Sequence, residues 1–457
     1  MKINRKLLAD WDRRYLWHPF TQMREWERGV PLIIERGQGP YLFDSDGTRY
    51  LDGVSSIWVN IHGHRHRTLD RALTRQLGRV AHSTLLGLSN PPAIRLAREL
   101  IRIAPRGLTR VFFSDDGSTA VEVALKMALQ YWQQCGRRAG RKRTFVHLEL
   151  SYHGDTLGAV SVGGVPLFHE RFKPLLFPSL SVPAPYCYRC PVKLKYPSCA
   201  LACLAPLEQV LKRRQRDIAG LIIEPLVQAA AGMITAPRGY LAAVRELCTR
   251  YDVLLIADEV ATGFGRTGRM FACQHEGVTP DLMAISKGLT GGYLPLAATL
   301  TTEAVYRAFL GEYADWKTFC HGHSYTGNPL GCAVALANLE VFRRARTMVK
   351  LRPKITALAR FLRPFAQLPC VGEVRQRGFM VGIELVQDRR TKAPYPPEDR
   401  VGHRVAMEAR RRGLLIRPLG NVVVLMPPLA ARIGELRRMT ALLYESIRSV
   451  TRADRGA

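Results

Sequence analysis

The sequence contains no uninterrupted apolar run that approaches the roughly 20 residues a membrane helix needs. Residues 1–10 have no apolar segment of the kind that marks a secretory signal, so we expect no membrane partner and a cytoplasmic location. Internal repeats and low-complexity stretches are also missing. The ten cysteines do not form the evenly placed pairs of a short disulfide-rich chain, and we expect most of them to be reduced thiols.

Acidic residues are scarce: 38 Asp and Glu stand against 67 Lys and Arg, which gives a formal net charge of +29. Such a charge is compatible with nucleic-acid binding or with a preference for anionic substrates. The basic residues lie in short runs such as residues 212–214, 343–344 and 410–412, with no nucleic-acid-binding motif and no interleaved aromatic residues. We therefore interpret them as a solvated basic face and expect no nucleic-acid partner.

With 457 residues, 47% of them hydrophobic, the chain is large enough to bury an extensive core. Its middle part alternates short apolar runs with helical stretches, which predicts an α/β fold with a parallel sheet covered by helices on both faces. The candidate buried strands are residues 110–113, 144–148, 221–223, 253–257 and 296–300. A hairpin is predicted over residues 42–51, with its turn at Asp46 and Gly47.

Three segments of the chain differ in pattern. Residues 1–75 are expected to form the N-terminal part of a small lobe, residues 76–334 a large domain with a cysteine-rich insertion at about 185–205, and residues 335–457 a C-terminal small domain. We expect both ends of the chain to form one smaller lobe packed against the large domain.

Polar residues that directly follow the predicted strands are the first candidates for a site, because ligands of such sheets gather at the strands' carboxyl ends. They are Asp115, Glu224, Asp258 and the segment that ends in Lys287. A carboxylate at Asp258, after the most hydrophobic strand, is energetically unfavourable unless a buried cation compensates its charge. Lys287 lies in a small-residue turn, where partial desolvation lowers the pKa of an amine and makes it a better nucleophile. Taken alone, each also fits a simpler role, a helix-capping aspartate and a surface lysine.

Two further sequence features complete the set of candidate site residues. A polar turn precedes a helix expected to begin near Ala120, with Thr119 and Glu122 at capping-box spacing. Backbone N–H groups at this helix start, together with the Ser118 hydroxyl, suit a phosphate group. Tyr152 follows another strand end, where it either stacks on a flat ring or plugs the end of the sheet. An amine, an acid, an anion site and a stacking aromatic are what pyridoxal 5'-phosphate (PLP) requires of a protein.

Nearly the whole chain resembles the fold-type I, class III aminotransferases, above all in residues 255–292, LIADEVATGFGRTGRMFACQHEGVTPDLMAISKGLTGG. The resemblance implies PLP as cofactor, and a large domain with a mainly parallel seven-stranded sheet between helices plus a smaller α+β domain from both chain ends. It implies that Lys287 forms the Schiff base and shuttles the proton, that Asp258 contacts the pyridine nitrogen, and that Val260 packs on a ring face. The other cofactor-binding residues it implies are Gly117, Ser118, Tyr152, His153 and Ser324.

Within that class, the chain resembles the diaminononanoate synthases of biotin biosynthesis. The motifs that carry this resemblance are WHPFTQM (17–23), SSIWVNIHGH (55–64), SYHGDTLGAVSVGG (151–164) and IRPLGNVVVLMPP (416–428). It implies an obligate homodimer with shared sites, and transfer of an amino group to 8-amino-7-oxononanoate, usually from S-adenosylmethionine. The substrate-binding residues it implies are Arg417 for the carboxylate, Asp155 near the amine, Arg266 as a second cation, Trp58 along the tunnel, and Phe20 and Gly322.

Three departures from this pattern affect the amino donor. Members that use S-adenosylmethionine commonly have Tyr at the position of Phe20, a second Trp at that of Ile57, and an aromatic at that of Val424. Some relatives use lysine instead, so both donors stay open. The alternative function is that of another class III ω-aminotransferase acting on a diamine or an ω-amino acid. A decarboxylating or racemising PLP enzyme is not distinguished by cofactor-site residues alone.

The insertion contains a cysteine cluster with the spacing C-x2-C-x8-C-x3-C, formed by Cys187, Cys190, Cys199 and Cys203. Four such thiolates can hold Zn²⁺ or an iron–sulfur cluster, and they can equally be reduced or locally disulfide-bonded. The resemblance requires no metal, and we assign none to the site. His62, His64 and His66 alternate in a loop with no carboxylate nearby in sequence, and we interpret them as structural.

Overall fold

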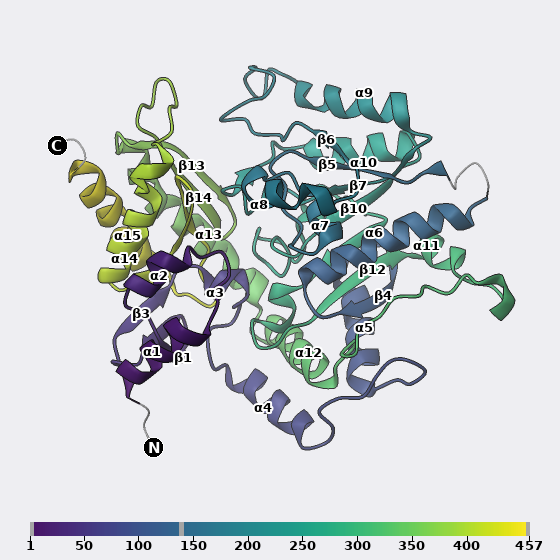
Figure 1. The fold of residues 1–457 in the computed structure, drawn as a ribbon, viewed down its shortest axis with the longest axis horizontal. Coiled ribbons are helices and arrows are strands. Elements are labelled where there is room, and N and C mark those ends of the chain that lie inside the picture. The colour runs from purple at the N-terminus through teal and green to yellow at the C-terminus, as the bar shows by residue number, and fades with distance from the viewer. Residues whose placement is uncertain (1–3, 137–140, 454–457) are drawn as a thin grey trace.

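A seven-stranded sheet organises the large domain in this computed structural model, which describes residues 4–136 and 141–453 (Figure 1). In spatial order the strands are β4 (Leu108–Ser114), β12 (Ala297–Thr302), β11 (Leu282–Ile285), β10 (Leu254–Asp258), β7 (Ile218–Ile223), β5 (Thr144–Leu148) and β6 (Leu180–Val182). Strand β12 pairs antiparallel with both of its neighbours, and the remaining neighbouring pairs are parallel. The predicted α/β fold with a mainly parallel sheet is confirmed.

The sheet is central because its middle strands are apolar on both faces. All residues of β7, β10 and β11 are buried. In β10, Leu254 and Ile256 pack with α6 (Gly117–Gln134), whereas Leu255 and Ala257 pack in the larger core that includes residues of α5 (Pro91–Ile103) and α10 (Tyr240–Arg250). Successive side chains of a strand point to opposite faces, so helices on both sides are needed to cover this sheet.

Two of the seven strands, β6 and β11, were not among the predicted ones. They have only three and four residues, too few for a periodicity signal. Strand β12 also runs antiparallel to its neighbours, whereas the alternation of apolar runs and helical stretches in the sequence predicts a parallel strand. No crossover helix long enough to return the chain to the same edge separates Ile285 from Ala297, so β12 runs back beside β11.

The two ends of the chain share one small sheet, formed by β1 (Ile34–Gln38), β2 (Tyr41–Asp44), β3 (Arg49–Asp52) and β15 (Leu414–Leu415). Strands β2 and β3 pair antiparallel around Gly47, whose φ is +81°, so the predicted hairpin is confirmed. A second small sheet contains β13 (Val371–Arg377), β14 (Met380–Leu385), β17 (Val422–Leu425) and β16 (Arg417–Leu419). Figure 1 shows the N-terminal elements in purple beside α14 and α15. The shared sheet supports the proposal of a single smaller lobe.

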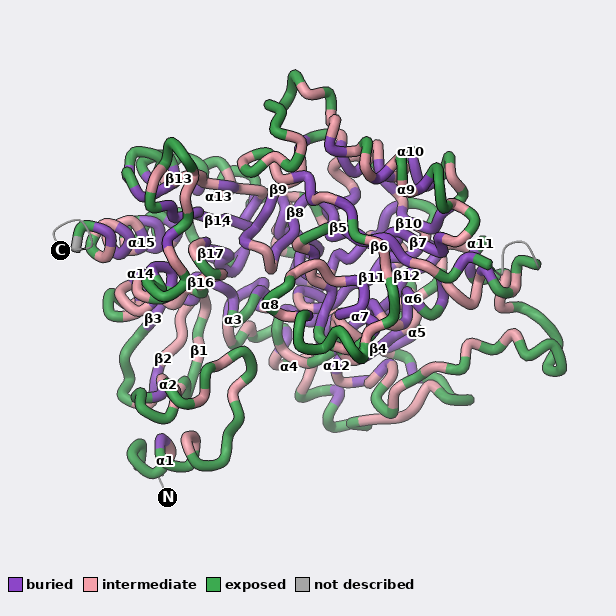
Figure 2. The backbone as a smooth tube through the Cα atoms, turned by 45° about the horizontal axis from the view of Figure 1, so that its top comes forward, coloured by how far each residue is buried: buried purple, intermediate pink, exposed green. Residues whose placement is uncertain are grey.

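The remaining regular elements complete the two lobes: α1 (Arg5–Tyr15), α2 (Met23–Arg28), α3 (Ser55–Trp58), α4 (Arg67–Leu77), α7 (Leu157–Ser161), α8 (Pro166–His169), α9 (Ala205–Arg214), α11 (Glu303–Ala308), α12 (Pro329–Arg344), α13 (Thr347–Leu362), α14 (Val401–Arg411), α15 (Ile433–Ala453), β8 (Val227–Gln228) and β9 (Ile234–Thr235). The predicted segment boundaries at 75/76 and 334/335 fall within α4 and α12, which pack on each other through Leu69, Val334 and Val341. Buried residues concentrate in the interior around the large sheet, whereas α1 and α2 are mostly exposed (Figure 2). No helix in the described part of the chain could span a bilayer.

Replacing Leu255 with Ala is expected to destabilise the protein by about 2–5 kcal/mol, because this fully buried side chain leaves a cavity in the core of the central sheet. The matched control is Leu175→Ala, whose side chain is 64% exposed, with an expected change of about 0.5 kcal/mol or less. Denaturant unfolding of both variants checks this difference. Equal destabilisation by the two would contradict a core centred on β10.

Candidate active site

The carboxyl ends of the parallel strands border a cavity of about 440 Å³. Eight of the predicted site residues line it: Trp58, Gly117, Ser118, Tyr152, His153, Asp258, Val260 and Lys287. Glu224, which follows β7, lines it as well. Among the strand-end residues singled out in the sequence, Glu224, Asp258 and Lys287 therefore meet at one place.

Lys287 comes directly after Ser286, at the end of β11, with a left-handed φ of +43°. The Ser286 hydroxyl donates to a backbone carbonyl at 3.0 Å, which fixes this turn. Burial lowers the pKa of Lys287 from its usual 10.5, against the opposing effect of the Asp258 and Glu224 carboxylates. The amine is therefore neutral more often than that of a surface lysine and is a better nucleophile. Its Nζ lies 5.2 Å from the ring centroid of Trp58.

Asp258 is a buried carboxylate held by two neighbours. Its Oδ2 lies 2.7 Å from Nδ1 of His153, and its Oδ1 accepts the backbone N–H of Val260 at 3.0 Å. The other ring nitrogen of His153, Nε2, is buried and has no hydrogen-bond partner within the described residues. A fixed, desolvated anion at the cavity wall stabilises a protonated nitrogen that enters the cavity.

Helix α6 begins at Gly117, not near Ala120 as predicted. The capping box is also one turn earlier: the Asp116 side chain accepts the Thr119 N–H, and the Thr119 hydroxyl accepts the Asp116 N–H. Glu122 accepts two backbone N–H groups in the first turn of α7 instead. The prediction of the helix start was wrong because Asp116, a strong N-cap residue, outcompetes Thr119 for that role.

The first turn of α6 is suited to an anion, and two glycines keep the space beside it open. Backbone N–H groups in a first turn have no intrahelical partner and favour an anion. The Ser118 hydroxyl accepts the Asp155 N–H at 3.3 Å, so its own hydrogen is left to donate. A Cβ on Gly154, whose φ is +127°, would lie 2.1 Å from Ser118 Oγ, and one on Gly117 would lie 2.7 Å from Cγ1 of Val260.

Tyr152 is held at the cavity edge by two carboxylates. Its N–H donates to Glu224 at 3.1 Å, and its hydroxyl donates to Asp155 at 2.7 Å. Burial raises the pKa of Tyr152, so the hydroxyl stays protonated, and burial raises the pKa of Glu224 to about 7. The Tyr152 ring meets Phe168 with centroids 5.9 Å apart, and Phe168 meets Phe20 at 5.3 Å. Asp155 and Phe20 thus lie next to the cavity without lining it.

The other predicted substrate residues lie farther out. Gly322, Ser324 and Arg417 are exposed and do not line the cavity of this described chain. Arg266 is buried and does not line the cavity either. Its guanidinium donates to the Ser55 hydroxyl and to the backbone carbonyls of residues 58, 60 and 427. The guanidinium therefore binds other groups of the protein behind the cavity wall and does not face the cavity itself.

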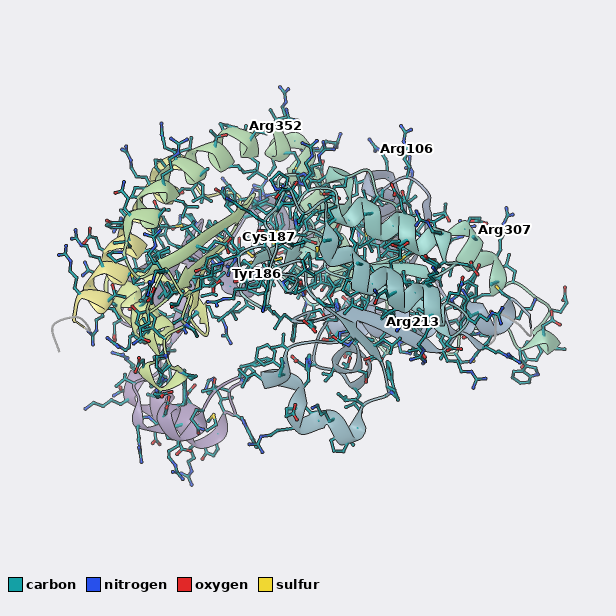
Figure 3. The ribbon with its side chains drawn as sticks, turned by 90° about the horizontal axis from the view of Figure 1, so that it is seen from above. Arg106, Tyr186, Cys187, Arg213, Arg307 and Arg352 are labelled. Carbon is teal, nitrogen blue, oxygen red and sulfur yellow. The ribbon has the colours of Figure 1, made fainter. Side chains whose placement is uncertain are left out.

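The cysteine-rich insertion packs against the smaller lobe. Its four thiols are free and line one small cavity of about 10 Å³, and within the described residues no group of three His, Cys, Asp or Glu side chains is arranged to hold a metal ion. The Tyr186 hydroxyl donates to Glu384 of β14, and Arg189 Nε donates to the same carboxylate at 2.7 Å. Figure 3 labels Tyr186 and Cys187 in this region. The insertion thus connects the two lobes.

A family profile described as aminotransferase class-III matches residues 22–447. The chain belongs to the class-III aminotransferases. These enzymes depend on PLP in general. The adenosylmethionine-8-amino-7-oxononanoate aminotransferase of Geobacter sulfurreducens is 56% identical to this class-III aminotransferase, over 97% of this chain and 98% of the relative.

Solved structures show the same fold at high similarity. The crystal structure of adenosylmethionine-8-amino-7-oxononanoate aminotransferase from Methanocaldococcus jannaschii matches with a TM-score of 0.93 and 46% identity, covering 98% of this chain and 99% of that one. An omega transaminase from Pseudomonas jessenii, solved in complex with PMP, matches with a TM-score of 0.93 and 32% identity, covering 97% and 98%. The fold is therefore common to both kinds of transaminase.

Replacing Gly154 with Ala is expected to reduce PLP retention, because the new Cβ collides with Ser118 at the anion site. The matched control is Gly277→Ala: Gly277 also has a positive φ, +66°, but a Cβ there meets nothing within 4 Å. Gly277→Ala should lose about 1 kcal/mol from the backbone conformation, and Gly154→Ala more, since φ +127° lies outside the left-handed helical region. Only Gly154→Ala should release cofactor on dialysis. Equal retention by the two variants would contradict the assigned anion site.

Proposed function

We propose that this chain is a PLP-dependent aminotransferase that converts 8-amino-7-oxononanoate to 7,8-diaminononanoate in biotin biosynthesis. The observation that carries the proposal is the shared cavity of Lys287 and Asp258, one after β11 and the other at the end of β10. The names of relatives up to 56% identical over nearly the full chain support the substrate.

The cavity residues fit PLP. The Gly117 and Ser118 turn would take the phosphate, the Asp258 carboxylate the protonated pyridine nitrogen, and Lys287 the aldehyde carbon. Tyr152 and Val260 would face the ring, and His153 would orient Asp258. When bound, PLP supplies an electron sink for the carbon that loses its proton.

Lys287 is the proposed catalytic base and acid. With PLP bound, the Nζ of Lys287 would take the proton from the amine-bearing carbon of the substrate and would be the group that gives this proton back. Burial favours this role because it brings the pKa of Lys287 downward, toward the working pH. The Glu224 and Asp258 carboxylates keep the protonated form accessible, since they raise the pKa of the same amine.

For the substrate, Arg417 is proposed to bind the carboxylate, Asp155 to lie near the amine, and Trp58 to line the tunnel. Phe20 and Gly322 are proposed as further substrate contacts. Arg266 is proposed as the second cation, acting from behind the cavity wall and not by contact with the substrate. Arg417 is exposed on β16, where a guanidinium is free to engage a carboxylate with two hydrogen bonds.

A homodimer with shared sites is proposed from the surface around residues 78–90 and 313–328. These segments contact each other: Asn90 Nδ2 donates to the Gly327 carbonyl at 3.1 Å. They expose large apolar side chains, namely Leu86, Leu88, Tyr313, Trp316 and Tyr325. Exposed apolar clusters of this kind mark interaction surfaces. In the dimer, Ser324 would add to the phosphate site of the neighbouring subunit.

The amino donor is proposed to be S-adenosylmethionine, with lysine as the alternative. The names of the relatives support the first donor. None of the three departures lines the cavity: Val424 is fully buried in β17, paired with Arg417 of β16, whereas Phe20 and Ile57 are 59% and 44% exposed. Direct contact with a donor is therefore proposed for Phe20 and Ile57, the two exposed departures.

Lys287→Ala is expected to abolish the absorbance band near the visible edge and to lower activity by about 10³-fold or more, because the amine both binds the cofactor and moves the proton. Lys212→Ala, on the helix α9 surface, is the control and should retain the band and the activity. Absorption spectra and steady-state rates check both variants. A Lys287→Ala protein with an unchanged band would contradict the cofactor assignment.

Incubation with 8-amino-7-oxononanoate and either S-adenosylmethionine or lysine is expected to yield diaminononanoate, detected by mass spectrometry. Product from lysine alone would correct the donor and leave the biotin assignment intact. No product from either donor, with turnover of a diamine or an ω-amino acid, would replace the assignment with a general ω-aminotransferase, the fold of which this chain also shares.

A further inference from the structure

The segment that carries Trp58 has a strained backbone. Ser55, Ser56, Ile57 and Trp58 are four consecutive non-glycine residues with positive φ, at 52°, 48°, 64° and 71°. L-residues disfavour the left-handed region, and runs of them there are rare. Strain of this kind persists only where the surroundings hold it. The residues that hold this left-handed turn therefore determine where Trp58 lies.

Asp52 holds the start of the left-handed turn. Its Oδ1 accepts the N–H groups of Val54 at 3.3 Å and Ser56 at 3.0 Å, and its Oδ2 accepts the Ser56 hydroxyl at 2.9 Å. Nε2 of His64 lies 3.0 Å from the same Oδ2. His64 has no carboxylate nearby in the sequence, but the fold brings it into contact with Asp52, twelve positions earlier in the chain.

The tautomer of His64 follows from its other neighbour. Asn60 accepts the Gly63 N–H at 2.7 Å with Oδ1, so its Nδ2 faces Nδ1 of His64 at 3.1 Å and donates to it. The imidazole hydrogen is then on Nε2 and points at Asp52. Each polar atom in this chain of hydrogen bonds has a matching partner, which fixes the Asp52 carboxylate in one orientation.

Arg266 holds the other side of the turn. Its guanidinium donates to the Ser55 hydroxyl at 3.2 Å, to the Trp58 carbonyl at 3.2 Å and to the Asn60 carbonyl at 2.8 Å. Burial lowers the pKa of Arg266 to about 9, and the negative charge of Asp52 opposes this shift. The turn therefore lies between a buried cation and a buried anion that compensate each other.

We propose that Asp52 is a positioning residue for the reaction: with Arg266 it holds residues 55–58 in the left-handed turn and thereby fixes the Trp58 ring beside Lys287. Trp58 lines the cavity, and its ring centroid is 5.2 Å from Lys287 Nζ, whereas Asp52 itself does not line the cavity. The inference rests on the proposed function, since it takes Lys287 as the reactive amine and Trp58 as a wall of the substrate site.

Asp52→Asn tests the proposal, because an amide has one acceptor oxygen where the carboxylate has two. Its NH2 group would face either the backbone N–H donors of Val54 and Ser56 or the side-chain donors of His64 and Ser56. The expected result for the PLP-bound enzyme is a KM for 8-amino-7-oxononanoate about tenfold higher, with a smaller change in kcat, since misplacing a wall of the site weakens substrate binding. Asp44→Asn is the control: Asp44 is a buried carboxylate at the other end of the same hairpin that also accepts from backbone N–H groups and a hydroxyl. It should leave KM unchanged.

A double-mutant cycle separates positioning from general destabilisation. In a Trp58→Ala background, Asp52→Asn should raise KM by less than about threefold, because a residue that acts through Trp58 has no further effect once the ring is gone. Ser56→Ala, which removes only the hydroxyl bond to Asp52, should shift KM in the same direction by a smaller factor. An unchanged KM in Asp52→Asn, or the same increase with and without Trp58, would overturn the proposal.

Hydrogen–deuterium exchange tests the same proposal without turnover. Asp52→Asn should speed exchange in residues 54–60 by about tenfold or more relative to Asp44→Asn, because the hydrogen bonds that hold the turn are lost. Equal exchange in the two variants would also overturn the proposal. A wild-type enzyme that does not act on 8-amino-7-oxononanoate would refute the proposed function, and the exchange result would still decide the role of Asp52.

Discussion

The structure depends on the placement of a desolvated amine opposite a desolvated carboxylate. Strands β10 and β11 pair in parallel, with Asp258 opposite Ala284, so Lys287 leaves β11 just beyond the point where Asp258 ends β10. Burying either charge alone is unfavourable by several kcal/mol. The cavity between them is therefore suited to a molecule that is positive at one end and reacts with an amine at the other, and the elements around it keep that space open.

The neighbouring residues show how this space is maintained. Gly117 and Gly154 keep the anion site at the start of α6 clear of side-chain atoms. His153 and the N–H of Val260 hold the Asp258 carboxylate from two directions. Tyr152, bonded to Glu224 and Asp155, closes the edge of the cavity. The proposed sites for phosphate, ring and amine thus come from separate turns that a single sheet edge brings together.

Local sequence patterns predicted the features that depend on short stretches of chain. Apolar runs identified the main strands, and the polar residues after them identified Glu224, Asp258 and Lys287 as neighbours. The Asp46 and Gly47 turn predicted its hairpin because the preference of glycine for positive φ acts within four residues. These features can be predicted without knowledge of the tertiary structure.

Features that depend on distant contacts could not be predicted in this way. The resemblance implied that Arg266 is a second active-site cation, but its partners include the carbonyl of Pro427, far away in the sequence. The left-handed turn at residues 55–58 contains no glycine, so no propensity signals it. The reversed direction of β12 and the short strands β6 and β11 are likewise decided by their neighbours in the sheet.

The pairing of β3 with β15 has a consequence for biosynthesis. Residues 51 and 52 pair with residues 414 and 415, and the Ser55 hydroxyl donates to the carbonyl of Met426. During translation, the hairpin of β2 and β3 leaves the ribosome before β15 does. The edge of β3 stays unpaired until almost the entire chain has been made. An open strand edge is a template for pairing with other chains. The N-terminal strands are therefore most open to wrong pairing while the central sheet is being made.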